Sequence, residues 1–377
     1  MRSSAKAAAT LGCLCALAVT GCSAGSGAAA DAAPHATAAS GAAPSRPAAS
    51  GTSYAPYVSA TTASPNDTAG SPAAYNLAFV VSRGSGCTPV WGGTHPIGDK
   101  AVKGRIARLK ATGAAVRVSF GGAAGKELAA VCGSASALAG AYGRALDAAG
   151  ASLADFDIEG DELSDPDSVA LRSRAVAALQ KERPDLKVSF TLPVMPSGLD
   201  PEGLALLRSA NAYGVQVSTV NLMTMNYAES YTGDMGDYAV TAARSAHTQL
   251  KKLLALSDAA AWRGMALTSM IGVNDIAGET FTLSDAARVR SFAEEKGIAW
   301  VSMWSAFRDQ PCAQGGGGKN ENGGGGGDGN GASGGDSAPG DESAPGDDSA
   351  PGAATEAAAD CSGVAQEPGA FGRAFTG

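Results

Sequence analysis

The stretch ADFDIEG, residues 154–160, places a carboxylate at every second position: Asp155, Asp157 and Glu159. In a strand, residues two apart point to the same side, so the acids share one face and the apolar residues between them share the other. Like charges this close repel and shift one another's pKa values, which indicates a functional site. The alternative is an exposed strand face whose acids are merely solvated. The apolar face needs burial, and this favours a barrel interior or a cleft.

Strand-like and helix-like segments alternate on both sides of this stretch. We predict strands at Tyr54–Val58, Asn76–Val81, Ala115–Phe120, Leu153–Glu159, Lys187–Leu192, Gln216–Met223, Met265–Ile271 and Ala299–Trp304. We predict helices at Lys100–Ala111, Ala135–Ala148, Ser168–Glu182, Pro201–Ala210, Tyr238–Leu254 and Leu283–Lys296. Alternation of this kind predicts a parallel sheet covered by helices. Eight strands predict an α/β fold closed into a (β/α)8 TIM barrel, whose active site lies at the carboxyl ends of the strands.

The barrel is expected to use residues 54–312, with a closing tail at 361–377. This is close to the roughly 250 residues typical of the fold. Residues 22–53 consist mainly of Ala, Ser, Gly, Thr and Pro and predict a disordered tether. Residues 313–360 combine glycine runs with a short repeat, DSAPGDESAPGDDSAPG, and predict a disordered Gly/Pro/Asp-rich insertion.

The sequence of the amino terminus predicts an export signal. A positive start at Arg2 and Lys6 precedes an apolar run that is too short for a typical membrane span. The run ends in LAVTGC, which resembles the bacterial lipoprotein signal. The resemblance implies cleavage after residue 21, a lipid on Cys22, and a location on the extracellular face of the membrane. The alternative is an ordinary secretory signal and a secreted protein.

Four cysteines remain after export and lipidation: Cys87, Cys132, Cys312 and Cys361. An even number in an exported chain suggests two disulfides, with three connectivities open. We favour Cys87–Cys132 and Cys312–Cys361, because each pair brackets one local region.

The composition argues against several classes of ligand. The net charge of −8 argues against nucleic acid as a partner, since that requires a basic footprint. Three scattered histidines and the lack of a CxxC pair among the four cysteines argue against a zinc site. We expect no metal and no cofactor, and we expect a monomer.

Four motifs, each at the end of a predicted strand, resemble glycoside hydrolase family 18, the chitinases. SLADFDIE at 152–159 is similar to the family's DxxDxDxE signature, and SFGG at 119–122 to its SxGG motif. VNLMTMNY at 220–227 and VSMWS at 301–305 are similar to its sixth and eighth strands. The segments at 189–199 and 270–275 also look like a bacterial chitinase subgroup. We expect the SFGG residues to shape the barrel interior.

The resemblance implies a mechanism in which the substrate's acetamido group attacks its own anomeric carbon. Glu159 is then the general acid/base, and Asp157 hydrogen-bonds the acetamide N–H. Asp155 holds and tunes Asp157, and Tyr227 hydrogen-bonds the acetamide oxygen. Trp304 forms the floor beneath the sugar. The implied activity is retaining hydrolysis of chitin or chito-oligosaccharides.

Other substrate contacts are expected beside this row. Asn226 and Met225 precede Tyr227, and Asn274 follows the seventh strand together with Asp275. Two positions depart from the family pattern. The first acid of the signature is Ser152, which is expected to retune the carboxylates, and Asn226 stands where the bacterial relatives often carry aspartate. Either departure could lower the rate or move the pH optimum.

Three other functions compete with a chitinase. An endo-β-N-acetylglucosaminidase acting on glycoprotein glycans would use the same chemistry. A non-catalytic sugar-binding lectin on the same barrel should have lost Glu159, which is present. A lipoprotein scaffold that only displays loops would not need the row of acids.

Overall fold

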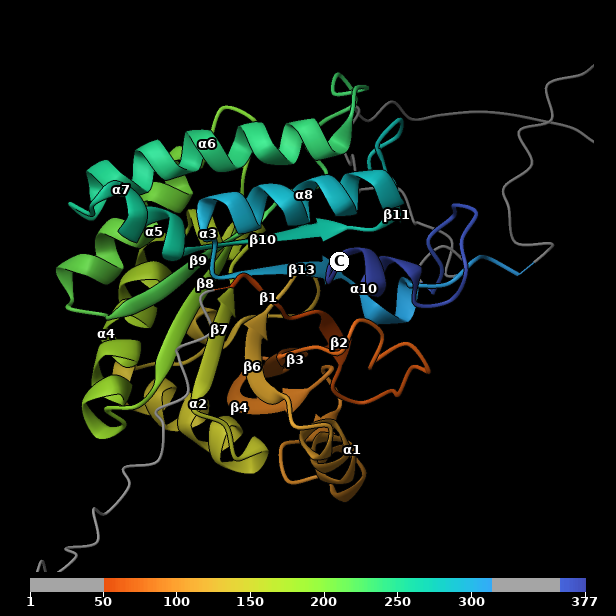
Figure 1. Cartoon of the computed structure of the whole chain (residues 1–377). Coiled ribbons are helices and arrows are strands. Elements are labelled where there is room, and N and C mark those ends of the chain that lie inside the picture. Colours follow the sequence, from red (N-terminus) through yellow and green to blue (C-terminus); the bar gives the residue numbers. More distant parts are fainter. Residues whose placement is uncertain (1–50, 314–359) are drawn as a thin grey trace, which may run out of the picture. The chain divides into compact units, whose positions relative to one another are not determined.

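The computed structural model describes residues 51–313 and 360–377 (Figure 1). The predicted signal peptide, the lipid attachment at Cys22, most of the tether and nearly all of the Gly-rich insertion therefore lie outside the described residues. None of the helices within these ranges is both long and apolar enough to cross a membrane.

A closed barrel of parallel strands forms the centre of the fold. The first barrel strand is split at Ala55–Pro56: its first half, β1, pairs with β13, and its second half, β2, pairs with β3. Since β1 and β2 are consecutive, the sheet closes on itself, and every other neighbouring pair around the ring is also parallel. The strands are β1 (Ser53–Tyr54), β2 (Tyr57–Ser59), β3 (Ala74–Arg83), β6 (Ala115–Gly121), β7 (Leu153–Asp157), β8 (Lys187–Pro193), β9 (Val217–Met223), β10 (Met265–Met270) and β13 (Trp300–Trp304). The predicted TIM barrel is confirmed.

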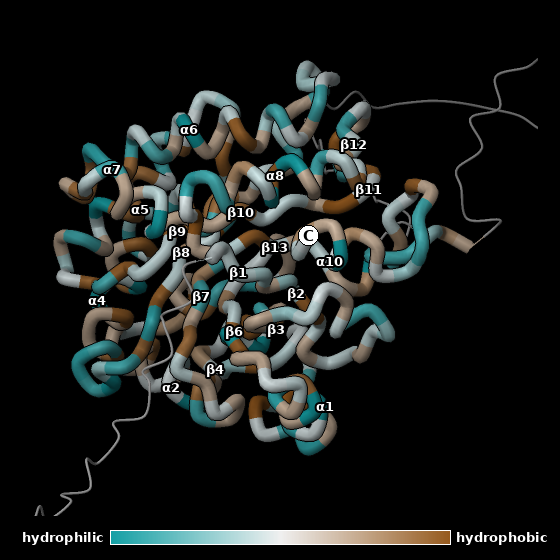
Figure 2. The backbone as a smooth tube through the Cα atoms, viewed as in Figure 1, coloured by the Kyte–Doolittle hydropathy of each residue, from teal (hydrophilic) through white to brown (hydrophobic). Residues whose placement is uncertain are grey.

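Six helices cover the outside of the barrel, as predicted (Figure 1). Each has an Asp, Ser or Thr at its N-cap whose side chain accepts a backbone N–H of the first turn, which favours the start observed. They are α1 (Lys100–Ala111), α2 (Ala135–Ala149), α4 (Pro166–Glu182), α5 (Pro201–Ala212), α6 (Met235–Leu253) and α8 (Leu283–Lys296). Figure 2 shows hydrophilic and hydrophobic residues alternating along α6 and α8, as expected of helices that cover a core.

Besides the barrel strands and the long helices, the structure contains several short elements that we did not predict from the sequence. Among the described residues, two antiparallel hairpins extend strand connections, and the remaining elements are helices of three to six residues. They are β4 (Gly86–Trp91), β5 (His95–Pro96), β11 (Gly272–Val273), β12 (Thr280–Phe281), α3 (Gly160–Ser164), α7 (Asp258–Arg263), α10 (Ala370–Ala374), η1 (Leu128–Ala130) and η2 (Ala306–Arg308).

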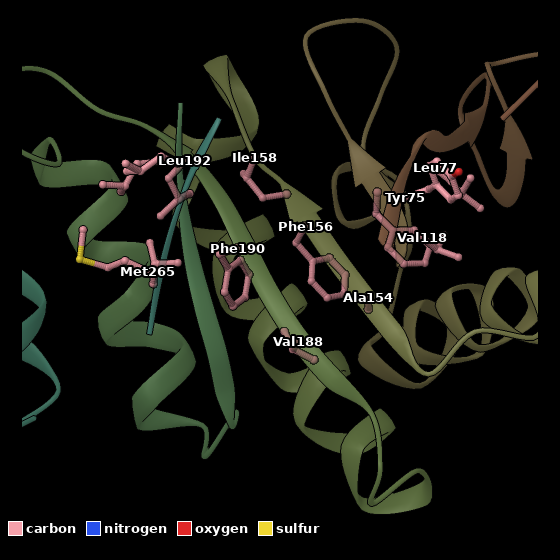
Figure 3. Close-up of a cluster of buried hydrophobic side chains, with 14 of the residues drawn as sticks. Tyr75, Leu77, Val118, Ala154, Phe156, Ile158, Val188, Phe190, Leu192 and Met265 are labelled. Carbon is pink, nitrogen blue, oxygen red and sulfur yellow. The ribbon is translucent and has the colours of Figure 1, made fainter. Parts of the chain in front are cut away.

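The outward faces of the strands pack against the helices to form the main core. Phe156 on β7 lies between Phe120 on β6 and Phe190 on β8, with ring centroids 5.3 and 5.6 Å apart. Tyr142 of α2 closes on Phe120 and Phe156 from outside, at 4.8 and 4.9 Å. Figure 3 shows Phe156 and Phe190 side by side on adjacent strands. The apolar face of the opening stretch is therefore buried, and its acidic face points into the barrel.

Both predicted disulfides are present. Cys87 in β4 is bonded to Cys132 after η1, and Cys312 is bonded to Cys361. The second bond joins the end of the barrel to the carboxyl-terminal tail. There, buried Asp309 accepts hydrogen bonds from the backbone N–H groups of Phe371 and Gly372, so the tail is held against the barrel.

Candidate active site

A cavity opens at the carboxyl ends of the barrel strands, where the fold predicts an active site. Its residues come from seven of the eight barrel strands and from loops at their carboxyl ends, including the loop after the remaining strand, β6. The lining consists of Tyr57, Phe79, Ala123, Asp157, Glu159, Thr191, Met223, Met225, Asn226, Thr268, Met270, Asp275 and Trp304. Six residues singled out in the sequence are among them: Asp157, Glu159, Met225, Asn226, Asp275 and Trp304.

Asp155 lies beneath this cavity and is fully engaged by hydroxyl groups. Its Oδ2 accepts from Ser119 Oγ at 2.7 Å and Tyr57 Oη at 3.0 Å, and its Oδ1 accepts from Ser189 Oγ at 2.6 Å and Thr191 Oγ1 at 2.9 Å. Only 1% of Asp155 is exposed. Two of these donors, Tyr57 and Thr191, line the cavity, so Asp155 lies behind the lining and does not reach the cavity itself.

Asp157 is the next acid along the strand, and it faces the cavity. It is buried, and within the described residues its Oδ1 has no hydrogen-bond partner. Burial, with the charges of Glu159 and Asp155, raises the pKa of Asp157 well above its ordinary value. A buried carboxyl oxygen without a partner is costly, and at the wall of a cavity it is an acceptor available to a ligand.

Glu159 stands at the rim. The strand β7 ends at Asp157, two residues earlier than predicted, and Glu159 is the N-cap residue of α3. Burial first, and then the charge of Glu162, raises the pKa of Glu159 to about 7. A carboxylic acid with this pKa holds a substantial fraction of its protons near neutral pH, as a general acid requires.

Glycines of the SFGG motif allow the strands to meet closely beneath the acids. A Cβ atom on Gly121, whose φ is +100°, would lie 2.1 Å from the backbone oxygen of Asp157. A Cβ atom on Gly122, whose φ is +88°, would lie 2.7 Å from the ring of Phe79. Ser119 contributes the hydrogen bond to Asp155 described above. The motif shapes the barrel interior, in line with its expected role.

Aromatic rings form one wall of the cavity. Trp304 at the end of β13 stacks on Phe79, with ring centroids 5.5 Å apart and planes inclined by 21°. Tyr57 and Phe307 meet Trp304 edge-on at 5.8 and 5.7 Å. Flat apolar rings of this kind are suited to pack against the faces of a sugar ring.

Asn226 links two loops across the mouth. Its side chain exchanges two hydrogen bonds of 3.1 Å with Asp275: Nδ2 donates to Oδ2, and Oδ1 accepts from the backbone N–H. Asn226 has a φ of +53°, in the left-handed region where asparagine is among the more tolerated residues. The neutral amide of Asn226 can donate a hydrogen bond to the carboxyl group of Asp275. An aspartate at position 226 could donate this bond only if it were protonated.

Two expected site residues lie away from the cavity. The ring of Tyr227 packs against Tyr231 and Tyr238, at 5.7 and 5.9 Å, and the residue is 4% exposed. Met225, two residues before Tyr227, lines the cavity instead. Asn274 donates its side-chain amide to the backbone oxygens of Met270 and Gly272 and thus holds its own loop. Neither Tyr227 nor Asn274 lines the cavity in this structure, and their expected substrate contacts stay predictions.

Ser152 also differs from the expectation. It lies before β7 begins, at the opposite end of the strand from the cavity, and it is exposed. The expected retuning of the carboxylates by this position is therefore not supported. The neighbours that govern Asp155 are hydroxyl groups of β2, β6 and β8.

Sequence reasoning missed several residues of the lining, above all Tyr57 and Phe79. Tyr57 sits in the middle of the first barrel strand and donates its hydroxyl to Asp155. Phe79 supports Trp304 from β3. Their signal was weak, because a lone tyrosine or phenylalanine in a strand is usually a core residue. Among the described residues, no group of three or more acids, histidines or cysteines could hold a metal ion.

Comparisons with known proteins show what the chain is related to. No family model matches the chain. The chain is 37% identical over 277 residues to a probable bifunctional chitinase/lysozyme of Escherichia coli (strain K12), and 36% identical over 278 residues to endochitinase 11 of Metarhizium anisopliae. The chain is related to chitinases. The alignments cover 68% and 69% of this chain but 31% and 53% of the relatives, so the chain spans less than two thirds of the length of either curated relative.

Solved chitinase structures share the fold. The catalytic domain of a hyperthermophilic chitinase from Pyrococcus furiosus matches with a TM-score of 0.67 and 27% identity, over 85% of this chain and 93% of that chain. Catalytic-site mutants of active domain 2 of a thermostable chitinase from the same organism, complexed with chito-oligosaccharides, match with a TM-score of 0.67 and 26% identity. A family 18 chitinase from Pseudoalteromonas aurantia matches with a TM-score of 0.51 at 15% identity, which concerns the fold alone.

Proposed function

We propose that this chain is a family 18 chitinase, which hydrolyses β-1,4-linked N-acetylglucosamine polymers or oligosaccharides with retention of configuration. The observation that carries the proposal is the pair Asp157 and Glu159 in one cavity. One is a buried carboxyl group with an oxygen free for a ligand, and the other is an acid with a pKa of about 7. The related chitinases give the substrate class.

In this proposal Glu159 protonates the oxygen of the leaving sugar and then activates the water that attacks the intermediate. The free Oδ1 of Asp157 accepts the acetamide N–H of the reacting sugar, which turns the acetamide oxygen toward the anomeric carbon. That oxygen displaces the leaving group, and water displaces it in turn. Two displacements at one carbon return the original configuration.

Asp155 has a positioning role. Four hydroxyl donors fix its carboxyl group, and its charge faces Asp157 from below. As positive charge develops on the cyclising acetamide, Asp157 is the nearest acid to balance it, with Asp155 behind. Trp304, supported by Phe79, gives the sugar ring and its acetyl methyl group an apolar floor.

The wider setting belongs to the same proposal. A signal at 1–21 and a lipid on Cys22 would carry the enzyme to the extracellular face of the membrane as a monomer. An endo-β-N-acetylglucosaminidase and a non-catalytic lectin are the competing functions on this barrel. The presence of Glu159 in the cavity favours catalysis over the lectin.

Incubation with a chromogenic chito-oligosaccharide separates these functions. A chitinase releases the chromophore and shortens soluble chito-oligosaccharides. An endo-β-N-acetylglucosaminidase would instead release glycans from a glycoprotein and leave chito-oligosaccharides intact. Saturable binding of chito-oligosaccharides without cleavage would overturn the proposal in favour of a lectin.

The pKa of Glu159 predicts the pH dependence of the reaction. Glu159 must carry its proton to act as an acid, so kcat/KM is expected to fall as the pH rises through about 7. The charge of Glu162 contributes to the raised pKa of Glu159. Glu162→Gln removes that charge, lowers the pKa of Glu159 and should move the falling limb to lower pH. A pH profile of kcat/KM for both proteins checks this, and an unmoved limb would contradict the assigned cause.

A further inference from the structure

Two more hollows adjoin the catalytic cavity, on different sides of it. One shares Phe79 and Trp304 with the cavity and continues over Phe307. The other shares Glu159, Met223, Met225 and Asn226 with the cavity and continues over the segment after β8 to the start of α5. Only the second contains Glu159, and only the first contains the aromatic wall.

If the proposed function is correct, the positions of the two hollows determine the direction in which the bound oligosaccharide lies. The reacting sugar lies over Trp304 with its acetamide at Asp157. Glu159 delivers its proton to the oxygen that links this sugar to the leaving sugar. The leaving sugar must therefore lie on the side of Glu159, in the hollow beside α5, which we call the leaving-group hollow.

The leaving-group hollow has a different chemistry from the aromatic side. Its remaining residues are Pro193, Val194, Met195 and Asp200. Among the described residues that line it, none is aromatic and none is basic. A sugar bound there lacks a stacking platform, so polar and charged groups decide which sugars are preferred.

Asp200 supplies that charge. It is the N-cap residue of α5, and its Oδ1 accepts the backbone N–H of Gly203 at 2.7 Å. Within the described part of the chain its second oxygen, Oδ2, has no hydrogen-bond partner. The partial positive charge of the helix N-terminus offsets part of the aspartate charge, but Glu202 in the first turn adds another negative charge. Asp200 therefore gives the wall of the hollow a negatively charged group.

We infer that the leaving-group hollow prefers a glucosamine residue, whose amine is protonated, over N-acetylglucosamine, and that Asp200 determines this preference. The inference rests on the proposed function. In the proposed mechanism only the reacting sugar needs an acetamido group, because this group is the nucleophile. The leaving sugar can therefore carry a free amine instead. Partly deacetylated chitin would then be cut between an acetylated sugar and a deacetylated sugar that follows it.

Two trisaccharides test this preference: one with three N-acetylglucosamine units, and one with glucosamine at the reducing end. The measured quantity is the ratio of kcat/KM for the bond to the last sugar, glucosamine over N-acetylglucosamine, at low ionic strength and a pH at which the amine is protonated. Asp200→Asn removes the charge and keeps a good N-cap. We expect the ratio to exceed one in the wild type and to fall about threefold in Asp200→Asn, the scale of a partly exposed charge pair.

Asp234→Asn is the matched control. Asp234 is the exposed N-cap residue of α6, its side chain accepts a backbone N–H in the same way, and it does not line the hollow. It should leave the ratio unchanged, and about 1 M salt should reduce the wild-type preference by screening. If Asp200→Asn lowers kcat/KM equally for both trisaccharides, Asp200 serves only as the N-cap of α5, and the inference is overturned. Cleavage of both with the same ratio in wild type and Asp200→Asn would also overturn it. No cleavage by the wild type would overturn the proposed function as well.

Discussion

Replacement of Glu159 by glutamine is expected to lower kcat on a chromogenic chito-oligosaccharide by at least about a hundredfold, the low end of the contribution of general acid–base catalysis. The amide has nearly the shape of the protonated acid, but it has no proton to give to the leaving oxygen. The loss should appear mainly in kcat, because Trp304 and Asp157 continue to hold the sugar. Steady-state kinetics of both proteins measure the effect.

Thermal melting provides the control for folding. Glu159 lies in a partly buried position and caps α3 without a side-chain hydrogen bond, so the glutamine variant should melt close to the wild type. Glu229→Gln, at an exposed acid in the loop after β9, should retain the wild-type kcat. Equal activity of Glu159→Gln and wild type would remove Glu159 from the mechanism.

Replacement of Asp157 by asparagine is expected to lower kcat by about a hundredfold or more, the effect of removing one preorganised electrostatic group from a transition state. Asparagine can still accept the acetamide N–H through its Oδ1, but unlike the aspartic acid it cannot lose a proton and become the anion that balances the positive charge forming on the acetamide. Stability should not fall, because the raised pKa of Asp157 means that its charged form is disfavoured in the folded protein. Kinetics and melting on one preparation measure both quantities.

Asp161→Asn is the comparison for this variant. Asp161 is an exposed acid in α3, four residues further along the chain, and it does not line the cavity. Its replacement should change kcat little. A kcat of Asp157→Asn within a few-fold of the wild type would mean that the buried carboxyl group does not stabilise the transition state.

The barrel could be predicted from the sequence because its signals are local and repeated. Each of the six long helices begins at a capping residue, and each barrel strand lies within a few residues of its predicted range. The split of the first strand at Ala55–Pro56 and the hairpins β4–β5 and β11–β12 were not predicted. These elements depend on contacts distant in sequence, such as the backbone hydrogen bond from Val273 to Ser362.

The acids of the site could be predicted for a different reason. Alternation within a strand places Asp155 and Asp157 on one face whatever surrounds them. It does not say which of them reaches the cavity, because the hydroxyl groups that engage Asp155 come from β2, β6 and β8. The distinction between a supporting acid and a cavity acid therefore needed the closed barrel.

Tyr227 illustrates the limit of reading roles from a motif. The loop after β9 turns at Asn226, where φ is +53°. Beyond that turn, buried Glu279 accepts the backbone N–H groups of Tyr227 and Ala228 at 2.7 and 3.0 Å and holds the tyrosine away from the cavity. Glu279 comes from the next loop of the barrel, 52 residues later in the chain. Spacing within the motif carries no information about that contact.

In the proposed mechanism the substrate's own acetamide acts as the nucleophile, Glu159 is the general acid, and Asp157 accepts the acetamide N–H. The most direct test follows hydrolysis of a chito-oligosaccharide by proton NMR and identifies the anomer of the new reducing end before it equilibrates. We expect the β-anomer to form first, since two displacements retain the configuration. If the α-anomer forms first, the mechanism is wrong, because a single displacement by water inverts the configuration.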